Sequence, residues 1–529
     1  MKQLKLEDLS VEQKLGQLIC ARSLKTQDDR DFAFGLMRDH ALGGVQAPVN
    51  ATAVADIIEP TLANADYPIL IGADMERGFQ NGDLEISSNL AIGALDEVDA
   101  TYAFVDSMAR QAKSFGWNMI WGPVVDAIRG DTPLRTLRAI GGDKELIARH
   151  AMAYIKAFAD NGVVGTVKHF PSIFDRVRDT HMWAPISYHT REEFMNDCLY
   201  PYRELIRELG DDMIGVMSSH VNCVNIDPEY PATLSKPCID MLREIGFDGM
   251  LITDSLAMMG IVQKYGDDKI PGMAVAAGHD LILPNYRVPL RDTYNSLVKA
   301  YREGVFDEQR LNDAVHHVLK AQAHTVRQPE NTEVGERERI LIDHINRDSI
   351  CAVVDEGLDP ALDTKKNYLF VILKPNDYSE EDLGQRAGYE IGFSRNWDHK
   401  HLAEIFKEKF PNSDFIFTCE FPHRNQNERV CAAAAAHEEV IFLTFCEANA
   451  YQGTDGLTER IRHLISTMQY HIPAIIHVGN PYAFEKVVHI PRLIFGFPHK
   501  TCMDALPAVL AGEIKPTGKL PFAINLPKK

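Results

Sequence analysis

The sequence predicts an α/β protein in which a (β/α)8 TIM barrel is followed by an α/β sandwich domain. The chain has 529 residues of ordinary globular composition, 45% hydrophobic and 25% charged. Eight apolar, strand-like runs alternate with helical patterns in its first part, as in a parallel sheet covered on both faces. Eight such units indicate a closed barrel. We therefore expect the barrel at residues 1–325, a linker and connecting helix at 326–350, and the sandwich domain at 351–529.

The expected barrel strands share an apolar core and are separated by helical patterns. They are Leu18–Arg22, Gly44–Pro48, Ile69–Met75, Asn118–Pro123, Val163–His169, Ile214–His220, Met250–Asp254 and Asp280–Pro284. The clearest intervening helix is predicted at 143–161, where Gly162 ends the apolar stripe. Similar stripes predict helices at 192–209 and 307–324. In the last of these, His316 and His317 are expected at the surface or its boundary and not as metal ligands.

The second domain is expected after a break in the pattern. Residues 325–338 are polar and contain proline and glycine, which is typical of a linker. A helix is expected near 344–356. The expected strands that follow are Tyr368–Leu373, Asp414–Cys419, Glu439–Phe445, Ala474–Gly479 and Leu493–Phe497. Five strands with helices between them predict a doubly wound sheet or an α/β sandwich.

Charge and cysteine content limit the classes of partner and compartment. The formal net charge of −20 disfavours nucleic acid and anionic membranes. No apolar run approaches the roughly 20 residues that a membrane span needs, and the first residues lack an apolar signal core. Nine scattered cysteines without a Cys-x-x-Cys pattern indicate reduced thiols and argue against disulfides or a zinc site. We expect a cytoplasmic protein without metal or organic cofactor, and its oligomeric state is left open.

Polar residues gather at the ends of the expected strands. Asp74, His169, His220 and Asp254 each end a strand, and the carboxyl ends of barrel strands form the active face. Asp254 could act as nucleophile, base or metal ligand, although aspartate at such a turn also caps helices. A set containing Asp74, Lys168, His169 and Arg138 suits a polyhydroxyl ligand. A phosphate or carboxylate would use the basic members equally well.

A second feature is the sequence Asp179-Thr180-His181, which follows the expected strand ending at His169. A carboxylate near an imidazole can raise the pKa of the ring and orient it, as a general acid/base requires. Two solvated loop residues would give the same pattern. This segment alone therefore does not distinguish a general acid/base from two solvated loop residues, and the other motifs must decide.

Several short motifs are distributed along nearly the whole chain. They are Lys168–Pro171 with Asp179–His181, Met217–His220 with Asp227–Ser235, Leu242–Gly249 running into Thr253–Met258, Ala277–Leu281, Val478–Tyr482 and Gly518–Phe522. Together, and in this order, they resemble glycoside hydrolase family 3, in its β-N-acetylglucosaminidase branch.

The resemblance implies a role for each matching residue. Asp254 corresponds to the catalytic nucleophile, His181 to the acid/base of this branch, and Asp179 to the partner of that histidine. The positions that hold the sugar correspond to Asp74, Arg138, Lys168, His169 and Met258. The implied activity is a retaining exo-β-N-acetylglucosaminidase or β-N-acetylhexosaminidase acting on small carbohydrates from cell-wall or chitin-type fragments, through a covalent glycosyl-enzyme.

Alternatives remain within and outside this class. The chain could be another exo-β-glycosidase or an N-acetylglucosaminide phosphorylase, or a catalytically silent sugar-binding or regulatory homologue. The sequence departs from the family where Ser172-Ile173-Phe174 replaces Gly-His-Gly and where Arg77 replaces a glycine. The altered loop should follow a different backbone path. Its Arg176 and Arg178 are either solvated or contact an acidic group on the substrate.

Overall fold

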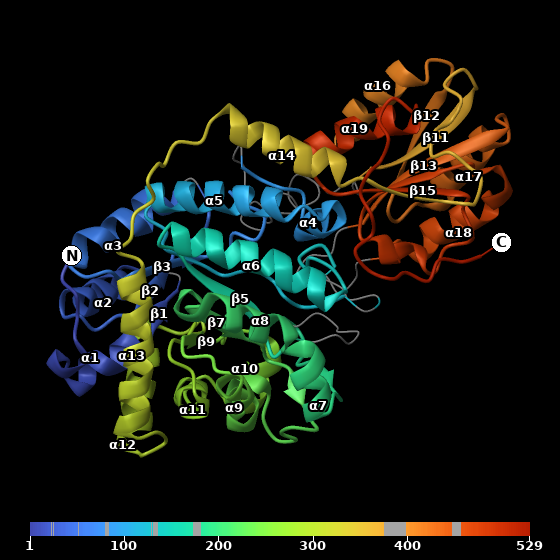
Figure 1. The fold of residues 1–529 in the computed structure, drawn as a ribbon. Helices are drawn as coiled ribbons and strands as arrows, with labels where there is room; N and C mark the ends of the chain where they lie inside the picture. The colour runs from blue at the N-terminus through green and yellow to red at the C-terminus, as the bar shows by residue number, and fades with distance from the viewer. Residues whose placement is uncertain are drawn as a thin grey trace. The chain divides into compact units, whose positions relative to one another are not determined.

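The computed structural model contains two compact units (Figure 1). It describes residues 1–22, 24, 26–50, 52–79, 84–128, 130, 136–172, 181–374, 398–446 and 456–528. The first unit comprises Met1–Glu85, Val98–Ala127 and Asp143–Arg339. The second comprises Ile86–Glu97, Ile128–Gly142 and Ile340–Lys529. Among the described residues, no helix is both long enough and apolar enough to cross a membrane.

The first unit is built on a ring of parallel strands. Its seven strands, in sheet order, are β1 (Cys20–Ala21), β2 (Gly44–Gln46), β3 (Leu70–Ala73), β4 (Met119–Ile120), β5 (Val164–Phe170), β7 (Gly215–Ser218) and β9 (Met250–Ile252). The eighth expected strand makes a single parallel bridge on each side, from Leu281 to Ile252 and from Ile282 to Ile19. These bridges link the last strand to the first, so the predicted barrel is confirmed.

Helices follow the strands and cover the ring (Figure 1). They are α1 (Val11–Gln17), α2 (Gln27–Arg38), α3 (Glu59–Asn64), α5 (Val98–Phe115), α6 (Lys144–Asp160), α7 (Arg191–Glu193), α8 (Tyr200–Leu209), α9 (Lys236–Glu244), α10 (Met259–Tyr265), α11 (Ile270–Ala277), α12 (Leu290–Arg302) and α13 (Glu308–His324). A further helix, α14 (Glu336–Asp348), contains residues of both units. The predicted helix at 143–161 is α6, capped by the Asp143 side chain, which accepts a bond from the Leu146 amide at 2.7 Å.

Two helix predictions need correction. The helix expected at 192–209 is divided into α7, a π turn at Phe194–Cys198, and α8. Pro201 lies in the first turn of α8, where its missing N–H costs nothing, and this favours a new start there. The helix expected near 344–356 ends at Asp348, and Cys351–Val354 forms β10 instead. Pairing of this segment with a distant strand decides its conformation.

The second unit contains a six-stranded sheet in the order β10-β15-β14-β13-β11-β12. The strands after β10 are β11 (Tyr368–Lys374), β12 (Asp414–Cys419), β13 (Glu439–Cys446), β14 (Ile475–Gly479) and β15 (Arg492–Gly496). All neighbouring pairs are parallel except β10 with β15. The helices are α4 (Asn89–Leu95), α16 (His399–Lys409), α17 (Arg424–Ala434), α18 (Glu459–Thr467) and α19 (Lys500–Leu510), of which α16 and α19 contribute to one buried cluster with the sheet.

Two segments from the first part of the chain belong to this second unit. The Lys519 amide donates to the Ala94 carbonyl at 2.9 Å, and the Gly142 amide donates to the Pro521 carbonyl at 2.9 Å. A side chain at Gly93 would place its Cβ only 1.8 Å from the Ile140 carbonyl oxygen, so glycine permits this close approach. The sequence pattern contains no sign of this exchange.

Candidate active site

The candidate site is formed by side chains at the carboxyl ends of the barrel strands. Asp254 lies two residues beyond β9 and is partly exposed. Its Oδ1 accepts a hydrogen bond from the Ser255 amide at 2.6 Å. Burial by itself would raise the pKa of Asp254, but His169, His220 and His181 outweigh it and lower this pKa to about 2. Asp254 is therefore an ionised carboxylate at neutral pH, as a nucleophile requires.

His220 supports the backbone next to Asp254. Its Nε2 lies 2.9 Å from the Ser255 carbonyl oxygen, which can only accept, so this nitrogen carries a proton. Its Nδ1 lies 2.7 Å from the Thr233 hydroxyl. Burial lowers the pKa of His220, whereas the nearby Asp254 carboxylate opposes that shift. The Thr233 hydroxyl donates its proton to the Ser219 carbonyl at 2.8 Å. Sequence reasoning placed His220 at the strand end, and the structure adds its role of holding the Ser255 turn.

Lys168 and Asp74 form a second part of the site. The Lys168 ammonium is almost fully buried and lies 2.7 Å from an oxygen of Asp74 and 2.7 Å from an oxygen of Glu76. The Asp74 side chain is 60% exposed, which leaves it accessible to a ligand. Lys168 thus fixes Asp74 at the end of β3. Glu76 was not predicted, because its role depends on Lys168, which is distant in the sequence.

His169 is oriented by a buried carboxylate. Its Nδ1 lies 2.7 Å from Oδ2 of Asp126, whose side chain is inaccessible to solvent. This contact fixes the ring of His169, and the positive charge of that ring lowers the pKa of Asp254. Asp126 was missed, although its place just after the apolar strand ending at Pro123 is the same signal that identified the other strand-end residues.

Arg22 is a further residue that sequence reasoning missed. Its guanidinium donates to the Ser255 hydroxyl and, at 2.5 Å, to Oε1 of Gln46. Burial lowers the pKa of Arg22, whereas the nearby carboxylates of Asp254 and Asp74 oppose that shift. Arg22 therefore places a positive charge within reach of both acidic groups. Its position as the last residue of an expected strand was the available signal.

His181 is brought to this cluster, whereas its expected partner lies outside the described residues. The electrostatic influence of His181 reaches both Asp254 and His220, and its carbonyl accepts a bond from the Met259 amide at 3.1 Å. Asp179, Ile173, Phe174, Arg176 and Arg178 lie outside the described residues, so the expectations for them stay predictions.

Ser172, the first residue of the altered loop, is described. It is buried and has a φ of 60°, in the left-handed region that glycine favours. The serine that replaces the first glycine of the family pattern thus adopts a backbone conformation that is natural for glycine. The expected different path of the loop beyond it stays a prediction.

Met258 and Arg138 are the two remaining predicted residues. Met258 is buried, and its amide donates to the Ser255 carbonyl at 3.1 Å. Arg138 belongs to the second unit, where its carbonyl accepts a bond from the Asn89 side chain at 2.7 Å. Sugar binding by Met258 and Arg138 stays a prediction.

The backbone that carries His181 packs against the start of α10. A Cβ at Gly260 would lie 2.6 Å from the Ala184 nitrogen and 2.9 Å from the Trp183 carbonyl carbon. We expect Gly260→Ala to displace this segment and to lower kcat on an aryl glycoside by about 10- to 100-fold. The matched control is Gly35→Ala, where a Cβ meets nothing within 4 Å. Equal kcat values for the two variants would contradict this account.

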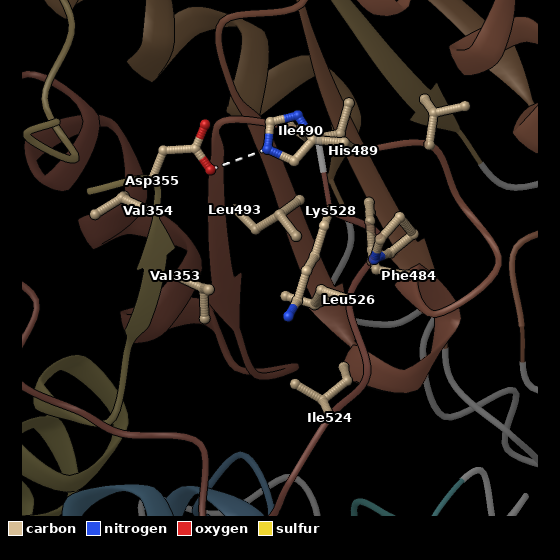
Figure 2. A pocket seen from close by; sticks show the side chains of 12 residues that line it. Val353, Val354, Asp355, Phe484, His489, Ile490, Leu493, Ile524, Leu526 and Lys528 are labelled. Carbon is tan, nitrogen blue, oxygen red and sulfur yellow. Dashed lines mark hydrogen bonds and ion pairs between the residues drawn. The ribbon is translucent and has the colours of Figure 1, made fainter. Parts of the chain in front are cut away.

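The second unit contains a cavity of about 370 Å3 (Figure 2). It is lined mainly by apolar side chains such as Val353, Phe484 and Ile490. Its carboxylate, Asp355, lies 2.9 Å from Nε2 of His489. Glycoside hydrolysis needs a second acidic or basic group on the other side of the bond, and the lining residues include no further carboxylate or histidine.

Among the described residues, no group of three or more His, Cys, Asp or Glu side chains could hold a metal ion.

Comparison with known proteins identifies the family. The model described as "Glycosyl hydrolase family 3 N terminal domain" matches residues 10–321, which is more than half of the chain. The chain belongs to glycosyl hydrolase family 3. The family 3 membership indicated by the motifs is thereby confirmed.

Curated relatives carry related names. A "Beta-N-acetylglucosaminidase/beta-glucosidase" of Cellulomonas fimi is 27% identical over 332 residues, which cover 60% of this chain and 58% of that protein. This chain thus spans less than two thirds of that relative's length. A "Beta-hexosaminidase" of Stenotrophomonas maltophilia (strain K279a) is 30% identical over 276 residues, covering 49% of this chain and 79% of that protein.

A solved structure resembles both units. It is a glycoside hydrolase family 3 β-N-acetylglucosaminidase from Paenibacillus sp. str. FPU-7, with a TM-score of 0.81 and 25% sequence identity. The alignment covers 98% of this chain and 99% of that one. The barrel followed by an α/β domain is therefore a fold already known within the family.

Proposed function

We propose that this family 3 protein is a retaining exo-β-N-acetylhexosaminidase that removes terminal N-acetylglucosamine from cell-wall or chitin-type fragments. The observation that carries the proposal is the ionised Asp254 surrounded by His169, His220 and His181. The names of the curated relatives and of the Paenibacillus enzyme support the choice of sugar.

The proposed reaction has two steps. Asp254 attacks the anomeric carbon and forms a covalent glycosyl-enzyme, while His181 protonates the leaving oxygen. His181 then removes a proton from water, which releases the sugar with retained configuration. Asp179 would stabilise the imidazolium. Asp74, fixed by Lys168, would accept hydrogen bonds from ring hydroxyls.

The function is tested by comparing the aryl N-acetyl-β-glucosaminide with the aryl β-glucoside. We expect a kcat/KM for the N-acetylated substrate that is at least about tenfold higher, which corresponds to about 1.4 kcal/mol of transition-state binding. A preference for the glucoside would favour another exo-β-glycosidase. No turnover of any aryl glycoside would contradict the proposal and favour a sugar-binding homologue.

Phosphorolysis is the second candidate reaction. A histidine is neutral after donating its proton, so it adds no second negative charge when an anionic phosphate approaches the glycosyl-enzyme. Product analysis with and without phosphate distinguishes the two reactions, because phosphorolysis releases a sugar phosphate.

Our proposal also includes a cytoplasmic location, with small carbohydrates and neither nucleic acid nor membrane as partners. The nine cysteines, all described and none in a disulfide, are compatible with that location.

A further inference from the structure

Exposed apolar side chains are concentrated in the segment that follows His181. Met182, Trp183, Ile186 and Tyr188 are 43%, 56%, 49% and 70% exposed. Isolated exposed apolar residues are normal, but a contiguous group marks a binding surface. Met182 and Trp183 lie one and two residues after His181, the proposed acid/base.

Contacts at both ends hold this segment in place. At one end, the Met259 amide donates to the His181 carbonyl, and Gly260 lies against the backbone of Trp183 and Ala184. At the other end, the Asn222 amide donates to the Pro185 carbonyl at 2.7 Å. The adjoining β6 (Ile186–Ser187) pairs in parallel with β8 (Asn222–Cys223). The exposed side chains are therefore carried by a fixed backbone, which reduces the entropy lost when a ligand binds.

We propose that Trp183, assisted by Met182, binds the leaving group of the substrate through the apolar face of a ring. The inference rests on the proposed role of His181. An acid that protonates the leaving oxygen must lie on the side of the bond where the leaving group departs. The next ring of the substrate therefore lies on the His181 side of the bond, and Met182 and Trp183 are the exposed residues that directly follow His181. The leaving groups that fit are a pyranose, whose C–H bonds can pack on an indole, or an aromatic ring.

The proposal commits to a sugar-sized ring and not to a protein partner. The segment lies against α10, which begins directly after the loop that contains Asp254. A partner protein seated on Trp183 would also approach His181 and obstruct the substrate. Binding energy gained from a part of the substrate remote from the bond can be used to lower the barrier of the reaction.

The kinetic test uses two substrates that share the sugar but differ in the leaving group. These are a β-1,4-linked disaccharide of N-acetylglucosamine and N-acetyl-β-glucosaminyl fluoride. We expect Trp183→Ala to lower kcat/KM by about tenfold more for the disaccharide than for the fluoride, with partial recovery in Trp183→Phe. Tyr470→Ala removes a 91% exposed aromatic side chain from the second unit and serves as the control. Equal losses on both substrates, or no loss, would overturn the proposal.

A binding measurement separates this inference from the proposed function. Calorimetry with the disaccharide compares Asp254→Ala with the double variant Asp254→Ala/Trp183→Ala, and we expect affinity about tenfold lower in the double variant. If the wild-type protein cleaves neither substrate but this difference persists, the proposed function fails and the ring-binding surface stands. If Trp183→Ala instead converts a dimer into a monomer in light scattering and binding is unchanged, the surface is a subunit interface and the inference is wrong.

Discussion

Replacing Asp254 with alanine is expected to lower kcat by about 10⁴-fold or more, in the range found when covalent nucleophiles are removed. The carboxylate supplies the bond to the anomeric carbon, and alanine has no oxygen with which to form that bond. Asp254 is partly exposed, so the variant should remain folded. The measurement is steady-state turnover of an aryl N-acetyl-β-glucosaminide, together with the thermal unfolding midpoint.

A small anion gives this prediction a sharper test. The space left by the missing carboxylate can admit azide, which would attack the anomeric carbon from the face that Asp254 used. We expect azide to restore part of the turnover of Asp254→Ala and to yield a glycosyl azide of inverted configuration. The control is Asp313→Ala, which removes an exposed carboxylate from α13. Turnover within a few-fold of the wild type for Asp254→Ala would exclude Asp254 as the nucleophile.

The sequence allowed the strand-end residues of this site to be predicted, because a strand followed by a polar residue is a local pattern. Asp74, His169, His220 and Asp254 were found in this way. Glu76 and Asp126 were missed because each acts through a partner many residues away, Lys168 and His169 respectively. Local patterns identify where a side chain stands along a strand, but its ionic partner follows from the packing.

Tertiary contacts likewise explain what was missed in the fold. The apolar run at Leu281 and Ile282 correctly predicted the eighth segment of the barrel. The segment at Cys351–Val354 was expected to be helical, and its pairing with β15 made it a strand. The position of Ile86–Glu97 in the second unit depends on the bond between Ala94 and Lys519, residues more than 400 positions apart.

The largest effect on stability is expected at Asp280, at the start of the eighth barrel segment. This fully buried carboxylate accepts bonds from the Leu251 amide at 2.9 Å and from Arg243 at 3.0 Å. It also contacts Arg310, and His317 approaches it at 3.1 Å. Asp280→Asn keeps the size of the side chain but leaves these basic groups without their counter-charge. We expect the free energy of unfolding to fall by about 3 kcal/mol, the lower end for a broken buried pair, because both arginines keep some contact with water.

The matched control is Asp248→Asn. Asp248 also faces His317, at 3.5 Å, but its side chain is 79% exposed. Exposed ion pairs contribute little, so the loss there should stay below about 1 kcal/mol. Urea denaturation at pH 7 measures both values. Similar losses for the two variants would contradict a special role of the buried carboxylate.

The effect of Asp280 should also depend on pH with a defined sign. Burial alone would raise its pKa, but His317, Arg243 and Arg310 outweigh burial and hold the pKa below its ordinary value. A carboxyl group with a lowered folded-state pKa stabilises the protein above its unfolded-state pKa of about 3.9, and this stabilisation is lost as the pH falls through the folded-state pKa. The difference in unfolding free energy between wild type and Asp280→Asn should therefore shrink as the pH falls below about 4. A difference that grows as the pH falls below about 4 would show that the carboxylate is not held ionised by its basic neighbours.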